Sequence, residues 1–73
     1  MTENDIVTVA YVDGGRITAY LGTVFAYADS YDGMIAKIVE QSKNRNASMV
    51  INFQISISGL FYGHGTAVRV ERA

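Results

Sequence analysis

His64, the single histidine of the chain, is the residue best suited to bind a ligand, and it stands between two glycines in the run Tyr62-Gly63-His64-Gly65. Glycines allow a backbone to approach a ligand closely and leave the neighbouring imidazole accessible. A metal ion prefers several donors, so His64 would need to meet its own copies, for example on the axis of a ring, to become a metal ligand. The plainer alternative is a solvated or hydrogen-bonded histidine in a strand.

Aromatic side chains supply the second candidate site. Phe61, Tyr62 and Tyr20 have flat rings on which a planar ligand can stack. Together with His64, the tyrosines Tyr62 and Tyr20 are the predicted ligand contacts. The competing interpretation places these tyrosines at an interface between subunits, where half-buried Tyr is common.

Two groups of charged residues invite a chemical interpretation but have structural ones as well. Asp13-Gly14-Gly15-Arg16 can offer backbone amides and a guanidinium to an anion, or it can be the turn of a hairpin. Asp29 and Asp32 fit the first turn of a helix, where negative charge is favourable, better than they fit a metal site. Glu40 fits the solvated face of the same helix, which is expected to carry Lys37, Gln41 and Lys43 as well.

Polar residues alternate along one later stretch of the chain, at Asn52, Gln54 and Ser56. They fit the lining of a pore or an interface, and equally a strand face turned to water. The sequence contains no nucleophile–base pair, phosphate-binding loop or dinucleotide-binding glycine pattern. We therefore predict no enzyme; an active site shared between subunits, with His64 as general base, is the remaining catalytic hypothesis.

Composition restricts the class of protein. The 73 residues predict a single domain, 1–73, whose core is small for a stable monomer. The chain has no cysteine, so oligomerisation is the expected source of additional burial. A net charge of -1 with scattered basic residues does not predict nucleic-acid binding. The polar, acidic start and the lack of a long apolar run predict a cytoplasmic protein without a membrane partner.

Hydrophobic periodicity predicts four strands and one helix. Period-2 runs rich in β-branched residues mark the strands, and apolar residues at i, i+3, i+4 and i+7 mark the helix. The expected order is strand 6–12, a turn at 13–16, strand 17–28 interrupted at Gly22, helix 29–44 with Asp29 as N-cap, strand 47–58 and strand 60–71. This order describes a two-layer α+β unit of β-β-α-β-β type, with one helix on a mostly antiparallel sheet.

The faces of these elements can also be predicted. Strict alternation predicts one buried face on the third strand, made of Ala47, Met49, Ile51, Phe53, Ile55 and Ile57. The last strand is expected to add to the same side its face of Leu60, Tyr62, His64, Thr66, Val68 and Val70. The helix is expected to cover that side with a stripe of Tyr31, Met34, Ile35, Ile38 and Ser42. Asn44 or Asn46 is expected to stop the helix in the left-handed conformation.

The second half of the chain resembles a known family. Asn46-Ala47-Ser48-Met49-Val50-Ile51, followed by a hairpin and by Gly65-Thr66-Ala67-Val68-Arg69-Val70, is similar to the signature of the YbjQ-like family, which is described as heavy-metal-binding. Arg16-Ile17 and Tyr20-Leu21-Gly22-Thr23-Val24 resemble the first hairpin of that family. The resemblance extends over most of the chain from about Ile6. Asn46 stands where the family usually has Gly, Ser48 stands where it usually has Asp, and the helix region is shorter.

The resemblance implies a dodecin-like subunit fold and a homopentamer in which sheets of neighbouring subunits close a shared core. It also implies a metal ion as ligand, although Ser48 and the lack of cysteine remove donors that a metal could use. The related dodecin fold stacks flavins, which implies a similar use for Tyr20, Phe61 and Tyr62. We thus expect a small cytoplasmic homo-oligomer that binds a small ligand or a metal ion, its cofactor and physiological role unknown. A ligand-free structural or protein-interaction ring is the alternative.

Overall fold

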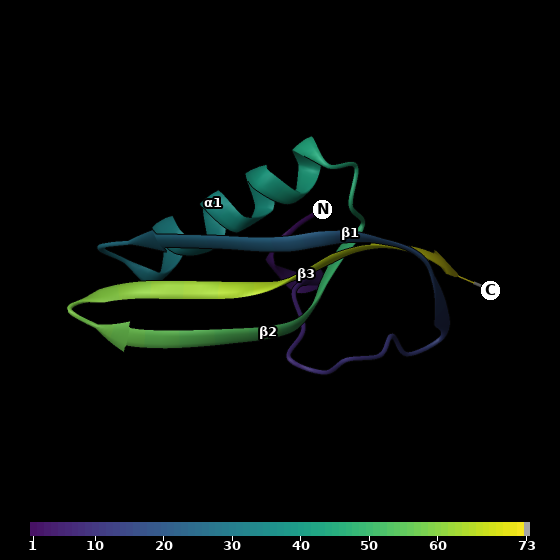
Figure 1. Ribbon diagram of the computed structural model, residues 1–73, viewed down its shortest axis with the longest axis horizontal. Coiled ribbons are helices and arrows are strands. Elements are labelled where there is room, and N and C mark those ends of the chain that lie inside the picture. The colour runs from purple at the N-terminus through teal and green to yellow at the C-terminus, as the bar shows by residue number, and fades with distance from the viewer. Residues whose placement is uncertain (73) are drawn as a thin grey trace.

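The computed structural model describes residues 1–72 as one helix packed on a three-stranded sheet (Figure 1). The strands are β1 (Gly15–Ala28), β2 (Met49–Ser58) and β3 (Leu60–Arg72), and the helix α1 (Tyr31–Asn44) connects β1 to β2. A short 3-10 helix, η1 (Glu3–Asp5), precedes them. The sheet order is β1-β3-β2 with both pairs antiparallel, so the predicted α+β class is confirmed and β3 is the central strand.

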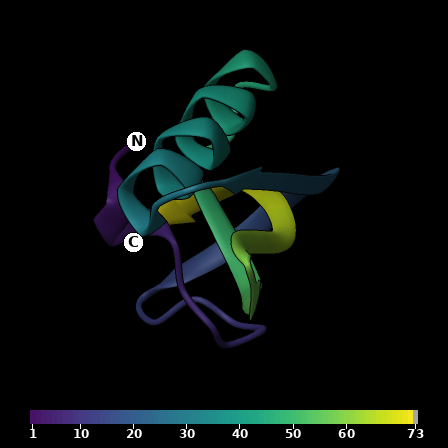
Figure 2. The ribbon, with the colours of Figure 1, turned by 90° about the vertical axis from the view of Figure 1, so that its left-hand side faces the viewer.

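The predicted strand 6–12 does not form, which corrects the expected β-β-α-β-β order to one with three strands. These residues form irregular chain, and Ile6 makes only an isolated parallel bridge with Val50 of β2. Residues 6–12 do not pair with β1 as a hairpin, because β3 pairs along one edge of β1 and side chains of α1 bond part of the other edge. The segment instead wraps around the start of β2 and continues beneath the sheet, on the side away from the helix (Figure 2).

Helix α1 begins and ends through side-chain and backbone features that are local in sequence. The Oγ of Ser30 accepts a hydrogen bond from the Gly33 N–H at 3.1 Å, so Ser30 is the N-cap and the predicted Asp29 is not. After the last turn, Asn46 adopts φ of 58°, the left-handed conformation expected at Asn44 or Asn46. The buried stripe of the helix is the predicted one without Tyr31, namely Met34, Ile35, Ile38 and Ser42.

The helix covers the glycine-bearing face of β3, so the prediction that it covers the face of His64 and Val68 is wrong. A Cβ added at Gly63 would collide with the side chains of Met34 and Phe53. Glycine therefore lets large side chains from α1 and β2 lie directly on the central strand. The resulting core is Val24, Ala26, Met34, Ile35, Ile38, Ala47, Val50, Phe53 and Ala67.

A bulge in β2 explains why its alternating sequence does not make one buried face. Asn52 has φ of 55°, and the pairing with β3 shifts by one residue between Ile51 and Gln54. Before the bulge, Ile51 lies on the face away from α1; after it, Phe53 lies on the helix side. The faces therefore exchange at Asn52. Ile55 and Ile57 follow on the helix side but are 42% and 68% exposed, because α1 packs mainly over β1 and β3.

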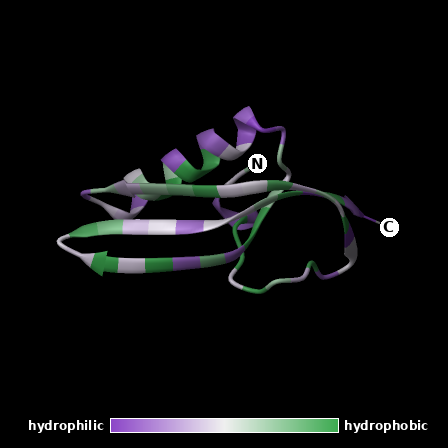
Figure 3. Cartoon of the chain, in the orientation of Figure 1, coloured by the Kyte–Doolittle hydropathy of each residue, from purple (hydrophilic) through white to green (hydrophobic). Residues whose placement is uncertain are grey.

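The face of the sheet away from the helix is covered only at one end. There the N-terminal segment packs Val7 and Val12 against a small second cluster of Met49, Ile51 and Val68. Hydrophobic residues recur in this segment and in all three strands, whereas the outer side of α1 is hydrophilic (Figure 3). Among residues 1–72, no helix has the length and apolar character needed to cross a bilayer.

Candidate functional site

The uncovered part of this face carries four rings, which we call the aromatic patch: Phe25, Tyr27, Tyr62 and His64. Phe25 of β1 pairs with His64 of β3, and Tyr27 of β1 pairs with Tyr62 of β3. Opposed residues of antiparallel strands project to the same face, so the four rings form a two-by-two array. Phe25, Tyr27 and Tyr62 are 53%, 57% and 38% exposed, so the array is open to a ligand or to another protein surface.

The geometry of the patch suits a planar ligand. The ring centroids of Tyr62 and His64 are 5.8 Å apart and their planes are tilted by 46°. The phenol hydroxyls and the imidazole nitrogens can exchange hydrogen bonds at the margin of an otherwise apolar surface. The Nζ of Lys37 lies 5.7 Å from the centroid of the Tyr27 ring, which places a positive charge at one border.

The polar residues predicted to line a pore or an interface border this patch in part. Gln54 and Ser56 pair with His64 and Tyr62, so they extend the same face onto β2. Asn52 serves a different purpose, because it forms the bulge that exchanges the two faces of the strand. The open face is therefore aromatic over β1 and β3 and polar without charge over the end of β2.

The glycines beside His64 have a packing explanation in this structure. Gly63 and Gly65 point to the helix side, away from the aromatic patch, where a Cβ at Gly65 would lie 2.7 Å from Val50 Cγ1 and 3.0 Å from the Ile51 carbonyl oxygen. These contacts, and not the approach of a ligand, account for glycine at both positions. His64 still lies on the open face, partly buried between its strand neighbours.

The structure separates one predicted ligand contact from the others. Tyr20 is 70% exposed and pairs with Val68, six residues along β3 from Tyr62. At a rise of about 3.3 Å per residue this separation is ~20 Å, too far for one small ligand to touch both tyrosines. Phe61, the other ring considered for stacking, packs against the core on the helix side.

Phe25 and Tyr27 are members of the patch that sequence reasoning missed. Their spacing of two residues was a signal, since alternate residues of a strand share a face. Both faces of the 17–28 strand contain apolar residues, a pattern typical of a strand that is covered on both sides, so the sequence does not indicate which face stays open. Pairing with His64 and Tyr62 depends on the β1-β3 register, which the sequence does not specify.

The donors around His64 do not fit a heavy-metal site within one subunit. Among residues 1–72, no three His, Cys, Asp or Glu side chains lie close enough together to hold a metal ion. The pairing partners of His64 are Phe25 and Gln54, neither of which is a usual ligand of a soft metal. A metal could use His64 only if several subunits brought their imidazoles together.

The other charged candidates have structural roles. Arg16 Nη2 lies 3.3 Å from Glu71 Oε2 across the β1–β3 pair, and both side chains are largely exposed. The guanidinium proposed to bind an anion is thus already next to a carboxylate. Asp29 precedes the N-cap and Asp32 lies in the first turn of α1, while Glu40 lies on its exposed side.

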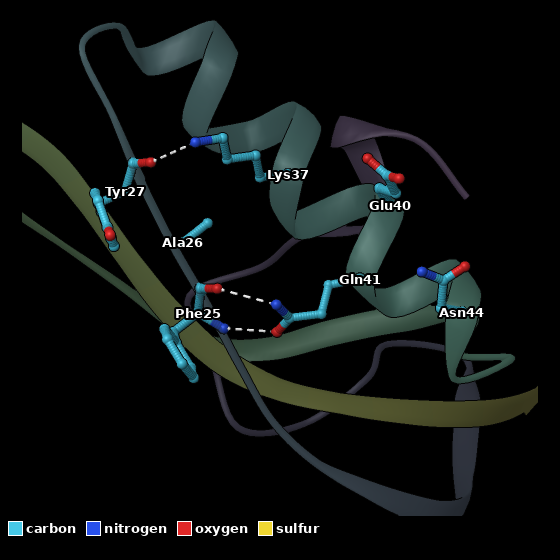
Figure 4. A pocket seen from close by; sticks show the side chains of 7 residues that line it. All are labelled: Phe25, Ala26, Tyr27, Lys37, Glu40, Gln41 and Asn44. Atoms are coloured by element: carbon cyan, nitrogen blue, oxygen red, sulfur yellow. Dashed lines mark hydrogen bonds between the residues drawn. The ribbon is translucent and has the colours of Figure 1, made fainter.

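A shallow cleft separates α1 from the outer edge of β1, and two helix side chains bridge it (Figure 4). The Phe25 N–H donates to Gln41 Oε1 at 2.9 Å, and Gln41 Nε2 donates to the Phe25 carbonyl at 3.2 Å. Lys37 Nζ donates to the Tyr27 carbonyl at 3.0 Å. The side chain of Gln41 thus pairs with the strand as a neighbouring peptide group would. Sequence reasoning assigned both residues to solvent.

Comparison with known proteins finds a relative that aligns with most of the chain. UPF0145 protein MJ1170 of Methanocaldococcus jannaschii is 30% identical to this protein, over 89% of this chain and 90% of the relative. No protein-family model matches the chain. The match extends over about nine tenths of each protein.

Proposed function

The chain belongs to the UPF0145 (YbjQ-like) family, and we propose that it acts in the cytoplasm as a homopentameric ring that binds a small planar ligand at the aromatic patch. The function of this family is uncharacterised, so the proposal depends on the site. One observation carries it: the chain leaves four rings clustered on an open sheet face, with Phe25, Tyr27 and Tyr62 well exposed.

Two physical arguments support this function. Contiguous exposed apolar surface on a small domain usually marks a binding site, because leaving it in water is unfavourable. Residues 1–72 contain twelve buried hydrophobic residues, which is a small core, so contacts between subunits would add the burial that it lacks. In a ring, part of the open face would meet a neighbouring subunit and the remaining rings would contact the ligand.

Native mass spectrometry of freshly purified, untagged protein tests the assembly. We expect a pentamer, and mild collisional activation should release any ligand carried through purification. A bare pentamer would favour the ligand-free scaffold, and a monomer at micromolar concentration would overturn the ring. A pentamer that carries metal ions only would indicate that His64 side chains meet, which His64→Ala should abolish.

Titration with riboflavin, used as a planar probe, tests the patch. We expect binding that weakens at least tenfold in Tyr62→Ser. The matched control is Tyr20→Ser, because Tyr20 is also an exposed tyrosine of the sheet but lies outside the patch. Equal loss in the two variants, or none in either, would contradict the assignment of the site.

A further inference from the structure

The two outer edges of the sheet differ in how well their backbone N–H and C=O groups are protected from pairing with another strand. This property is separate from the aromatic patch. Along the outer edge of β1, side chains of α1 bond the backbone at Phe25 and Tyr27, and Arg45 Nη1 donates to the Leu21 carbonyl at 3.0 Å. The first half of β1 has register shifts after Ile17 and after Tyr20, which bend the strand. Side-chain blocks and bulges of this kind prevent another strand from adding to an edge.

The first half of β2 is protected by a different device. The N-terminal segment lies along its outer edge, where Val7 N–H donates to the Val50 carbonyl at 2.9 Å. In return, the N–H groups of Asn52 and Phe53 donate to the carbonyls of Val9 and Val7 at 2.8 and 3.0 Å. These bonds end at Phe53. Within residues 1–72, no hydrogen bond from another segment reaches the outer edge of residues 54–58.

Residues 54–58 have no feature that would repel a second strand. Their sequence, Gln-Ile-Ser-Ile-Ser, contains no charge and no proline, which are the usual means of protecting an edge. All five residues are exposed, and Ile55 and Ile57 present apolar side chains on one face. This segment can therefore accept a strand from another molecule.

We propose that residues 54–58 pair antiparallel with the same residues of a second copy, about a two-fold axis at Ser56. A second copy is the fitting occupant because its own open edge is this same segment, its other edges being blocked or bent. With Ser56 opposite the partner's Ser56, Ile55 lies against the partner's Ile57 and all five residues pair. A shift by one residue would instead oppose isoleucine to serine and put the two helices on opposite faces.

The product is a continuous six-stranded sheet with both helices on one face and both aromatic patches on the other. The inference depends on the backbone edge alone and is independent of the proposed ring. If the pentamer is correct, this pairing joins two rings into a decamer. If the pentamer is wrong, the pairing gives a dimer.

Single-cysteine cross-linking tests the pairing, since the chain has no cysteine of its own. Directly opposed residues have Cα atoms about 5 Å apart, within disulfide range, so Ser56→Cys should form a covalent dimer under mild oxidation. Ser58→Cys is the matched control, being a serine of the same strand and face. In the proposed register its own copy lies ~13 Å away, so we expect dimer formation at least tenfold slower.

Equal cross-linking of the two variants, or none in Ser56→Cys, would overturn the pairing. Ile57→Lys supplies an independent measurement, because its exposed position allows the variant to fold. It should halve the number of subunits in the assembly, as measured by native mass spectrometry. Tyr20→Lys, at a similarly exposed site, should leave that number unchanged. A ring without the Ser56 cross-link would support the proposed function and reject this inference. A cross-linked dimer without a ring would support this inference and reject the proposed ring.

Discussion

The same strands form both faces of the sheet, but one face is covered by other parts of the chain and the other is largely open. On the covered face, β3 presents Gly63 and Gly65, and the large side chains come from elements packed on it, such as Met34 and Phe53. On the open face, β3 presents Tyr62 and His64, which have no such cover. The comparison indicates that residue size along β3 follows what lies against each face. Small residues lie on the face that other parts of the same chain cover, and large rings lie on the face that is free to contact another molecule.

The largest effect is expected from filling the covered face. Gly65→Val should lower the free energy of unfolding by about 3 kcal/mol, because the new side chain would overlap Val50 and the backbone of Ile51 and Phe53. Denaturant unfolding measures the change. Thr66→Val, which adds no bulk at the next residue on the opposite face, should change it by less than about 1 kcal/mol. Similar losses in both variants would remove the distinction between the faces.

An intermediate effect is expected where the helix that covers this face begins. Ser30→Ala removes the hydroxyl that accepts from the Gly33 N–H and should destabilise the protein by about 1 kcal/mol. Thermal unfolding of this variant beside Asp29→Ala distinguishes the two candidate caps. A larger loss in Asp29→Ala would show that the cap predicted from sequence is the correct one.

The smallest effect on stability is expected on the open face. Phe25→Thr introduces a β-branched residue that suits a strand and removes a ring that is 53% exposed, so the free energy of unfolding at low protein concentration should change by less than about 1 kcal/mol. Its effect should appear instead in assembly or ligand binding, as a shift of the concentration at which oligomers dissociate. A large loss of stability in the dilute protein would mean that the face is already covered within the subunit.

The sequence predicts the local features of this fold better than the relations between elements. The helix stripe, the interruption at Gly22 and the turn at Gly59 depend on neighbouring residues, and the structure contains them. The faces of β2 could not be predicted, because the bulge occurs at Asn52, where neither Gly nor Pro marks it. The extra residue there puts Met49 and Ile51 on the face opposite to Phe53, Ile55 and Ile57, although the alternation predicts one shared face.

The candidate site shows the same limit. Tyr62 and His64 were identified from β3 alone, since two residues two apart share a face whatever pairs with them. Phe25 and Tyr27 could be placed beside them only from the register of β1 with β3. Tyr20 was assigned to the same site although the sequence does not give its distance from Tyr62. Gln41 and Lys37 were assigned to solvent because the β1-β3-β2 order, which exposes the β1 edge to α1, is a long-range property.

The position of β3 at the centre of the sheet has a consequence for protein synthesis. Both strands that it joins are translated before it, and they pair with β3 and not with each other. Until β3 has been synthesised and has left the ribosome, β1 and β2 have no strand partner, and both contain isoleucine, valine and aromatic residues. Such nascent chains are open to association with one another or with chaperones. Because the central strand comes last in the sequence, the sheet cannot form before β3 has left the ribosome.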